Sequence, residues 1–407
     1  MRYKFRARID RFNPLLKAFV DVTDEEPGEG LAWAAKSNIA VSGLPWTAGC
    51  EAYRHRIASQ DAEVISRIRA SGGSILGTVN MHEGALGATT DNVAYGRTQN
   101  PWRIEITPGG SSGGSGAAVA AGLCDVALGT DTMGSVRIPA AYCGVQGHKP
   151  SSGTVPDNGV VPLSTTLDHV GPLARDVDTL WRAMHVLADW GKAPTLAAAD
   201  LSAVKIGIWD GAGAVSLTPA IAAGFADAVA RVEEQGAALR AIVPPVYDYS
   251  RSRRAGLVVS EVEGAKEHGV TADGPRPDGL SDTFYNLLRW GVRQSAEKVE
   301  EAYAHIRDVH GAVAEVWRDV DFVLAPTAPQ EAFHFDTDVP ANQADFTAWA
   351  DFARLPATAL FCGLSEDGLP LSLQLIGPEG GDRETLKVAA ALEAIFGKPP
   401  MPPGFDW

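Results

Sequence analysis

The sequence predicts an α/β fold, a single large α/β/α sandwich around a mixed, mostly parallel β-sheet. Short apolar runs alternate along the chain with longer segments whose apolar residues recur at helical spacing, and this alternation is typical of α/β proteins. Of the 407 residues, 45% are hydrophobic and 21% are charged, a composition typical of globular proteins with a large core. No internal repeat and no linker of disordered composition divides the chain, so one domain is expected over residues 1–407.

The first half of the chain is expected to contain two buried strands with helices beside them. The apolar runs at residues 74–79 and 125–129 predict short strands. Apolar residues at helical spacing predict a helix over residues 61–70. The alanine-rich segment 115–121 predicts a buried helix that follows a glycine-rich entry.

The second half continues this alternation. A strand over residues 204–209, a helix over about 219–234 and a strand around 241–243 form a strand–helix–strand unit. A long amphipathic helical stretch is expected over residues 295–317. The remaining elements expected are a strand over 321–326, a strand over 370–376 and a closing helix over 383–396.

The charge and the cysteine content exclude several partner classes. Lys and Arg number 35 and Asp and Glu number 50, so the formal net charge is −15. An acidic surface repels phosphate backbones, and no nucleic-acid partner is expected. The four cysteines form no CxxC pair, and no metal or cofactor site is expected. No apolar stretch is long enough to span a membrane and no secretory signal is recognised, which predicts a cytoplasmic protein without a membrane partner.

The segment from Pro108 to Gly116 is the most unusual in the chain, because only Gly and Ser follow the proline. A flexible linker is one interpretation, but linkers rarely run directly into an apolar helix. The patterns of a phosphate-binding P-loop and of a GxGxxG dinucleotide site are both absent. Residues 110–114 match the G-x-S-x-G elbow of α/β-hydrolases, although no apolar strand directly precedes them.

Two further residues suit nucleophilic catalysis. Ser135 lies in a tight loop between a buried strand and a helix, where backbone N–H groups would stabilise an oxyanion. The alternative for this serine is an ordinary helix N-cap. Lys36 lies between apolar flanks in a predicted strand. It either extends its amine to solvent at a sheet edge or, if buried without an acidic partner, has a lowered pKa and acts as a base.

Together these segments resemble the amidase signature family. The resemblance rests on four stretches, which are residues 36–38, 80–83, 109–116 and 130–140. It is dense in the first part of the chain, returns near the C-terminus and is loose in between. The resemblance therefore predicts a signature core over about 31–175, a variable region over about 176–320 and a C-terminal sheet and helix portion over about 321–396.

The resemblance implies the amidase signature fold and a Ser–Ser–Lys triad. Ser135 would be the nucleophile, and Ser111, held by a cis peptide bond, would pass the nucleophile's proton on to Lys36. Lys36 would be neutral in the resting enzyme and would later return a proton to the leaving amine. The oxyanion hole would consist of the N–H groups of Thr132, Met133, Gly134 and Ser135.

Substrate-binding residues are expected next to this triad. Arg137 is expected either to reach a substrate carboxylate or to form a structural ion pair with Asp131. Met133 stands where many family members carry glycine, and its side chain is expected either to narrow the pocket floor or to constrain the backbone. The segment before Lys36 is short compared with many members, which bears on the dimer contacts usual in the family. The residues expected to contact the substrate are Met81, Gly110, Asp131 and Arg137.

The predicted activity is that of an amidohydrolase that cleaves the C–N bond of a small-molecule amide, carbamate or ureido compound. A serine acyl-enzyme would give a carboxylate together with ammonia or an amine. The expected partner is that small molecule, and assembly into a homodimer stays open.

Three other interpretations also stay open. One is the glutamine amidotransferase subunit of a tRNA-dependent transamidosome, which the acidic charge disfavours. Another is a binding protein that kept the fold without the activity. The third is a serine hydrolase with a histidine base, for which His148 and His169 are the nearest candidates.

Overall fold

The computed structural model describes residues 3–25, 28–211 and 213–406. Its framework is an 11-stranded β-sheet, and β4 (Asp91–Asn92) and β5 (Gly96–Arg97) form a separate two-stranded sheet. The strands of the large sheet are β1 (Phe19–Val22), β2 (Ala32–Lys36), β3 (Ser74–Val79), β6 (Val126–Asp131), β7 (Gln146–Lys149), β8 (His169–Ala174), β9 (Lys205–Ile208), β10 (Ala238–Ala241), β11 (Phe322–Pro326), β12 (Ala357–Leu364) and β13 (Pro370–Ile376).

The large sheet is mixed, and its order is β1-β3-β2-β6-β8-β7-β12-β13-β11-β9-β10. Parallel pairs form two blocks, β3-β2-β6 and β11-β9-β10. Antiparallel pairs fill the centre between these blocks and attach β1 at one edge. The predicted α/β fold around a mixed sheet is confirmed. The antiparallel centre has a local cause where β12 and β13 meet, because the short turn 365–369 is too short for the crossover that a parallel pair needs.

Helices flank this sheet on both faces. The α-helices are α1 (Tyr3–Leu16), α2 (Glu63–Ala70), α3 (Gly113–Ala120), α4 (Arg137–Cys143), α5 (Val177–Leu187), α6 (Pro219–Glu234), α7 (Tyr249–Glu267), α8 (Asp282–Val292), α9 (Ala296–Ala312), α10 (Ala348–Phe352) and α11 (Asp382–Phe396). Short 3-10 helices are η1 (Glu51–Tyr53), η2 (Glu83–Ala85), η3 (Leu201–Ala203) and η4 (Val313–Arg318).

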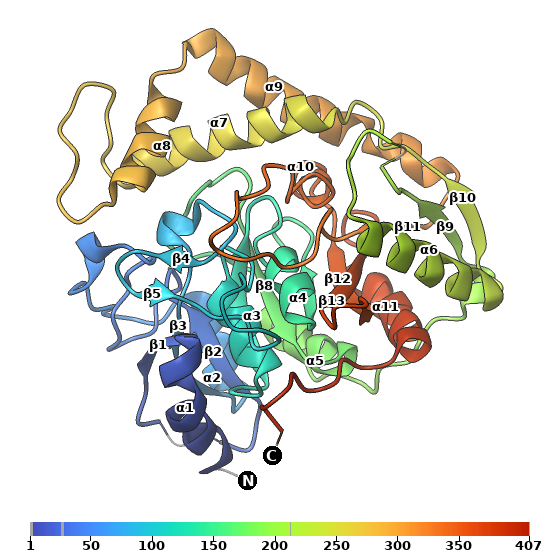
Figure 1. Cartoon of the computed structure of the whole chain (residues 1–407), viewed down its shortest axis with the longest axis horizontal. Helices are drawn as coiled ribbons and strands as arrows, with labels where there is room; N and C mark the ends of the chain where they lie inside the picture. Colours follow the sequence, from blue (N-terminus) through green and yellow to red (C-terminus); the bar gives the residue numbers. More distant parts are fainter. Residues whose placement is uncertain (1–2, 26–27, 212, 407) are drawn as a thin grey trace.

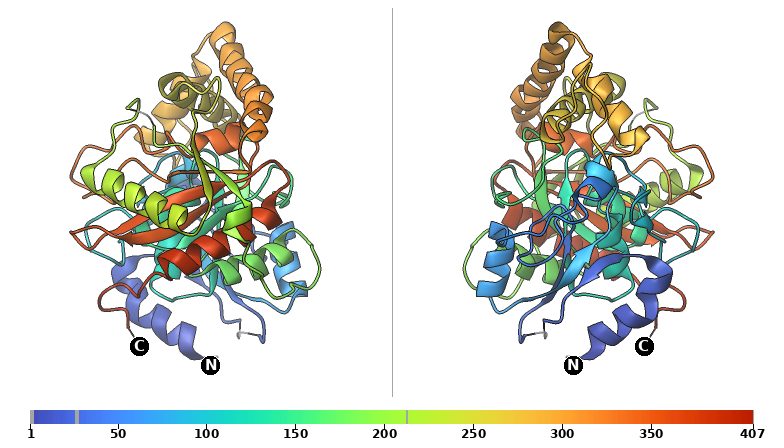
Figure 2. Two further views of the ribbon diagram at one scale, coloured as in Figure 1. Left: turned by 90° about the vertical axis from the view of Figure 1, so that its right-hand side faces the viewer. Right: turned by 90° about the vertical axis from the view of Figure 1, so that its left-hand side faces the viewer.

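The apolar core is divided by the sheet. α2, α5, α6 and α11 bury apolar side chains against one face, around Val126 and Leu324. α1, α3 and α4 pack on the opposite face, around Ala34 and Ala127. A further apolar cluster joins α7, α9 and α10 around Trp209. Figures 1 and 2 show α7, α8 and α9 together at the end of the molecule opposite to α1.

Most predicted elements occur close to their expected positions. β3, α6 and β13 have the predicted bounds. β6 extends past its expected end to Asp131, and β10 ends at Ala241, where the strand was expected to begin. The helix expected over residues 295–317 ends at Ala312 and continues as η4.

The sequence analysis does not predict α7. Small and polar residues such as Ser252, Gly256 and Ser260 occupy its buried face. The apolar periodicity that reveals an amphipathic helix is therefore weak. Its start does carry a local signal, since the Asp248 side chain accepts a hydrogen bond from the Arg251 N–H and caps the helix.

Within the described ranges, no helix is long and apolar enough to cross a bilayer. The cytoplasmic location and the single-domain organisation stay predictions. The described residues also include no group of three or more His, Cys, Asp or Glu side chains arranged to hold a metal ion.

α3 lies in direct contact with the backbone of a neighbouring segment. A Cβ atom at Gly114 would lie 2.6 Å from the backbone nitrogen of Asn80 and would also clash with the Asn80 carbonyl oxygen. The Gly114 N–H donates a hydrogen bond to that oxygen at 3.1 Å. Glycine at this position therefore lets the first turn of α3 rest on the segment after β3, and this contact fixes the chain just after Ser111.

Gly114→Ala is expected to lower the midpoint of thermal unfolding, because overpacking against backbone atoms costs about 1–3 kcal/mol. The matched control is Gly311→Ala in α9, where nothing lies within 4 Å of the added Cβ. Alanine is a better helix former than glycine by about 1 kcal/mol, so the control should keep or raise the midpoint. Circular dichroism melts of both variants check this, and an unchanged midpoint for Gly114→Ala would contradict the close packing.

Candidate active site

The three predicted catalytic residues lie on segments that meet at one edge of the sheet. β2 ends at Lys36 and pairs in parallel with β6, so the carboxyl ends of both strands lie at the same edge. Ser135 lies in the loop that leads from β6 to α4, and Ser111 lies two residues before the start of α3. The fold therefore brings together three residues that are far apart in the sequence.

Lys36 is 0% exposed, and its Nζ lies 2.7 Å from Ser111 Oγ. The same Nζ lies 2.8 Å from the Thr130 hydroxyl and 3.4 Å from the Thr130 carbonyl oxygen. A neutral amine has two N–H donors and one lone pair. When both donors point at Thr130, the lone pair faces Ser111, as a base for the Ser111 proton requires. Nothing in the sequence singles out Thr130, because threonine is an ordinary strand residue.

Burial sets the protonation state of the lysine. Desolvation lowers the pKa of Lys36 to about 7, and the negative charges of Asp168 and Asp131 oppose part of this shift. Asp168 accepts a hydrogen bond from the Thr132 hydroxyl at 2.6 Å and two more from backbone N–H groups. Burial raises the pKa of Asp168 to about 6, so this carboxylate is mostly ionised at neutral pH. Asp168 thus binds Thr132 in the loop before Ser135 and also raises the pKa of Lys36. Nothing in the sequence singles out this residue.

The Gly110–Ser111 peptide bond is cis, as the resemblance implied. Ser111 is buried, and its carbonyl oxygen accepts a hydrogen bond from the His82 N–H at 3.0 Å. The neighbouring Ser112 is buried too, and its hydroxyl donates to the Thr130 carbonyl oxygen at 3.2 Å. A serine engaged with the backbone of β6 in this way does not suit the exposed nucleophile of an α/β-hydrolase elbow.

Ser135 and the loop before it line a cavity of about 160 Å³. In the part of the chain that the structure describes, the N–H groups of Thr132, Met133 and Ser135 have no hydrogen-bond partner, and they are available to an oxyanion. Gly134 differs, because its N–H donates to the Asp131 carboxylate. Of the four N–H groups predicted to form the oxyanion hole, the one of Gly134 is therefore already engaged.

The walls of this cavity come from segments that are distant in the sequence. The segments 85–88 and 340–344 line the cavity, and Ile138 and Leu163 add apolar surface. α7 contributes Arg253, Leu257 and Ser260. The sequence carries no signal for the wall residues on α7 or in the 340–344 loop, because both segments lie outside the motifs of the resemblance.

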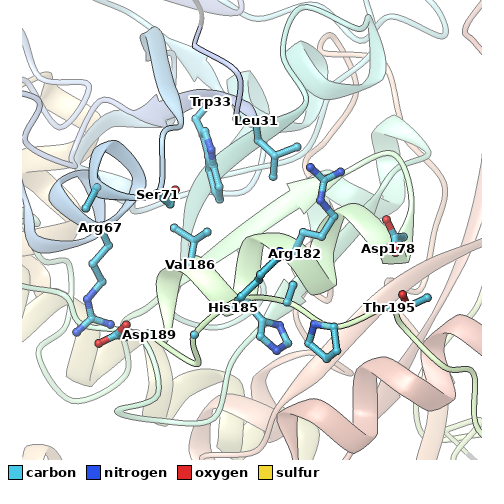
Figure 3. A pocket seen from close by; sticks show the side chains of 16 residues that line it. Leu31, Trp33, Arg67, Ser71, Asp178, Arg182, His185, Val186, Asp189 and Thr195 are labelled. Atoms are coloured by element: carbon cyan, nitrogen blue, oxygen red, sulfur yellow. The ribbon is translucent and has the colours of Figure 1, made fainter.

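A larger cavity lies elsewhere in the molecule. A hollow of about 900 Å³ is formed by α2, α5 and the segment 189–195, and Trp33 and Arg182 are among the residues that line it (Figure 3). None of the three predicted catalytic residues lines it. The contact between the lysine amine and the serine hydroxyl, rather than cavity size, locates the candidate active site.

The four residues predicted to contact the substrate occupy different environments. Gly110 lines the cavity beside Ser135. Met81 is fully buried in an apolar cluster that also contains the wall residues Leu86 and Leu163, and Asp131 and Arg137 are fully buried as an ion pair. Among the described residues that line the cavity, none of these last three is found.

Arg137 is surrounded by protein groups. Its Nε and Nη2 donate to Asp131 at 3.0 and 3.1 Å, and Nη2 also donates to Asp351 at 2.7 Å. Its Nη1 donates to the Gln374 side chain at 2.9 Å and to the Thr347 carbonyl oxygen at 2.8 Å. Burial alone would favour a neutral acid, but the guanidinium holds the pKa of Asp131 well below its usual range. Of the two roles expected for Arg137, the structural ion pair is the one that its surroundings allow.

Neither histidine of the alternative triad lines the cavity. The two ring nitrogens of His148 lie 2.9 Å from Thr358 Oγ1 and 3.4 Å from the Asp382 carboxylate. His169 Nδ1 lies 3.4 Å from a backbone carbonyl oxygen of β6, and burial lowers the pKa of His169 to about 3. The arrangement favours the lysine over a histidine as the base.

Comparison with known proteins decides the family. A family model described as Amidase matches residues 7–386. The chain belongs to the amidase signature family. The prediction of an enzyme that acts on amide C–N bonds is confirmed at this level.

Individual members of the family are similar over nearly the whole chain. A glutamyl-tRNA(Gln) amidotransferase subunit of Lachnoclostridium phytofermentans is 33% identical, covering 93% of this chain and 86% of that protein. The crystal structure of the corresponding subunit of Thermotoga maritima has a TM-score of 0.86 and 27% identity, covering 98% and 93% of the two chains. The structure of 6-aminohexanoate cyclic dimer hydrolase with its substrate has a TM-score of 0.84 and 26% identity, covering 97% and 92%.

These relatives correct one expectation. The net charge of −15 led to the prediction that the chain has no nucleic-acid partner. That prediction was wrong, because the relatives include subunits of an amidotransferase named for a tRNA. A formal net charge sums over the whole surface and does not exclude a tRNA-linked assembly. Of the two functions predicted for an active enzyme, the relatives favour the amidotransferase subunit over the small-molecule amidase.

The rate at which a fluorophosphonate labels Ser135 is expected to rise with pH through a midpoint near 7. Only the neutral amine of Lys36 takes up a proton, and this form prevails above its lowered pKa of about 7. Intact-protein mass spectrometry at a series of pH values measures the rate. A rate that does not change with pH, or that falls as the pH rises, would contradict the role of the lysine.

Asp168→Asn is expected to move that midpoint to lower pH. The substitution removes a negative charge that raises the pKa of Lys36, so the amine loses its proton at a lower pH. Asp157→Asn, which neutralises an exposed carboxylate nearby in the sequence, is the matched control and should leave the midpoint in place. An equal or higher midpoint in Asp168→Asn would show that this carboxylate does not act on the lysine.

Arg137→Met is expected to destabilise the protein by about 3–5 kcal/mol, because it leaves buried Asp131 and Asp351 without their counter-charge. Urea unfolding followed by tryptophan fluorescence measures the loss. Arg182→Met in α5 removes an exposed guanidinium and is the control, with a change close to zero expected. Equal stabilities of the two variants would rule out a structural role for Arg137.

Proposed function

We propose that the chain hydrolyses the side-chain amide of glutamine and releases ammonia, as the amide-cleaving component of a tRNA-linked amidotransferase. The observation that carries the chemistry is the 2.7 Å contact between Lys36 Nζ and Ser111 Oγ, next to the cavity that Ser135 lines. The choice of glutamine is supported by the relatives, which are named as subunits of a glutamyl-tRNA(Gln) amidotransferase.

In the proposed mechanism, Ser135 Oγ attacks the carbonyl carbon of the amide. Its proton passes to Ser111 Oγ while the proton of Ser111 passes to the neutral amine of Lys36. The carbonyl oxygen becomes negatively charged and accepts hydrogen bonds from the unpaired N–H groups of the loop before Ser135. The lysine ends this step as an ammonium group.

The second half of the mechanism returns that proton. Collapse of the tetrahedral intermediate breaks the C–N bond, and the Lys36 ammonium supplies a proton through Ser111 to the nitrogen, which leaves as ammonia. A water molecule then attacks the acyl-enzyme and passes its proton along the same relay. The proton returns to Ser135 when the carboxylic acid is released, so one amide and one water give one acid and one ammonia.

The size of the cavity supports a small acyl group. A dry cavity of about 150 Å³ holds a molecule the size of benzene, and the cavity beside Ser135 has about 160 Å³. The side chain of glutamine is of this size. A large acyl group attached to a macromolecule is not.

A second candidate is a free-standing amidase that acts on another small amide. The cavity wall is mainly apolar, which favours this second candidate; its apolar residues include Leu86, Ile138, Leu163 and Leu257. The similarity to 6-aminohexanoate cyclic dimer hydrolase also favours it. The two candidates share the chemistry and differ in their substrate and their need for partner chains.

Labelling by a fluorophosphonate tests the chemistry. Intact-protein mass spectrometry with peptide mapping should find the adduct on Ser135 in the wild type and none in Ser135→Ala. Lys36→Ala should label about 100- to 10,000-fold more slowly, because a general base contributes that much to the rate. An adduct on Ser112, or equal labelling of Lys36→Ala, would reject the proposed triad.

Ammonia release tests the substrate. Glutamine is incubated with the chain alone and with the other subunits of a glutamyl-tRNA(Gln) amidotransferase added. Ammonia release that depends on Ser135 and increases with the added subunits is expected. A protein that labels on Ser135 and hydrolyses simple amides, but leaves glutamine intact in both mixtures, would be the free-standing amidase.

A further inference from the structure

α7 turns one face toward the active-site cavity. Arg253, Leu257 and Ser260 occupy positions i, i+4 and i+7 of this helix, and all three line the cavity. Gly256 lets the sulfur of Met133 pack against the helix, since a Cβ at position 256 would lie 2.5 Å from that sulfur. α7 is therefore a wall of the substrate site.

Arg253 is the one charged side chain among the described residues that line this cavity. Its side chain is 29% exposed, whereas the side chain of its ion-pair partner Asp345 is 4% exposed. A ligand in the cavity therefore reaches the guanidinium of Arg253 and not the carboxylate of Asp345. Arg137, which the sequence analysis considered for a substrate carboxylate, is fully buried and cannot serve in this way.

Asp345 holds the guanidinium of Arg253 in place. Nε donates to Oδ1 at 2.9 Å and Nη2 donates to Oδ2 at 2.7 Å. Asp345 is itself fixed, because its N–H donates to the Asn342 carbonyl oxygen at 3.0 Å and its own carbonyl oxygen accepts from the Tyr247 hydroxyl at 2.8 Å. In the described part of the chain, Nη1 of Arg253 has no hydrogen-bond partner. A donor held in one orientation binds a carboxylate with little loss of side-chain entropy.

A second polar group on the same face of α7 also lacks a partner. Ser260 is 2% exposed, and its hydroxyl makes no hydrogen bond to any described residue. A buried hydroxyl without a partner costs free energy. Its position in the cavity wall makes this hydroxyl available to a bound ligand.

We propose that Arg253 binds a carboxylate of the substrate, so that the site prefers amides whose acyl chain carries a carboxylate. The inference rests on the proposed function and deepens it, since glutamine carries such a group. Asp345 does not prevent a second carboxylate from binding. In the same protein, Arg137 holds the carboxylates of Asp131 and Asp351 at once.

Glutaramate and pentanamide test this proposal, because they have the same chain length and differ by one carboxylate. The wild type should have a higher kcat/KM for glutaramate. Arg253→Gln should lower that value about 10- to 100-fold, mainly through KM, and should change pentanamide less than about threefold. Arg254→Gln makes the same charge change at an exposed position of α7 and should leave both substrates unaffected.

Two further measurements keep the test independent of folding and of turnover. Arg253→Gln leaves a buried carboxylate without its partner, so Arg253→Gln/Asp345→Asn, which removes both charges, is measured beside it. Titration calorimetry on Ser135→Ala reads glutaramate binding without hydrolysis. The Kd should rise about tenfold or more when Arg253 is replaced in that background.

The outcomes separate this inference from the proposed function. Equal losses for both amides, or an unchanged Kd for glutaramate, would overturn the role of Arg253. Hydrolysis of pentanamide that depends on Ser135, with no preference for glutaramate, would keep the amidase chemistry and reject the carboxylate site. Binding of glutaramate that depends on Arg253, with no amide hydrolysed, would support the carboxylate site and reject the proposed function.

Discussion

The candidate site depends on the exclusion of water from one lysine amine. Burial is what lowers the pKa of Lys36 to about 7 and makes a neutral amine available. A buried amine is costly unless its donors are paired, and the hydroxyl and carbonyl of Thr130 pair them. Thr130 lies on β6, the strand that neighbours β2 in the sheet. The same strand pairing therefore places the proposed base beside the residue that pairs its donors, which leaves the lone pair of a neutral amine for Ser111.

A second constraint keeps the loop before Ser135 in shape. Arg137 donates hydrogen bonds to Asp131 of β6, Asp351 of α10 and Gln374 of β13. These contacts connect the loop to segments that are distant in the sequence. Asp131 takes the N–H of Gly134 out of the predicted oxyanion hole. The same carboxylate also accepts from the Val136 N–H, so Asp131 holds the backbone on both sides of Ser135. Donors held rigidly before the charge develops are what electrostatic catalysis requires.

The sequence predicts the parts of this site that have a local pattern. Lys36, Ser111 and Ser135 are recognisable because each lies in an unusual segment of the chain. Thr130 and Asp168 are not, since their role comes from contacts with residues distant in sequence. Apolar runs and helical periodicity predict the positions of elements such as β3, α6 and β13, but they do not predict the order of the strands in the sheet. Periodicity also fails for α7, whose buried face is small and polar. Net charge fails as a guide to partners for a related reason, because it contains no information about where the charges lie.

Chemistry and specificity occupy different layers of the fold. The lysine and serines lie at the sheet edge, whereas α7 and the loop 340–344 form the outer wall of the cavity. Met133 lies in the loop before Ser135 and packs against α7, because its sulfur occupies the space beside Gly256. The side chain at position 133 is therefore accommodated by the helix, and Met133 forms part of the cavity wall. Because Arg253 lies on α7 and Lys36 lies at the end of β2, the charge of the cavity wall can change without disturbing the buried amine.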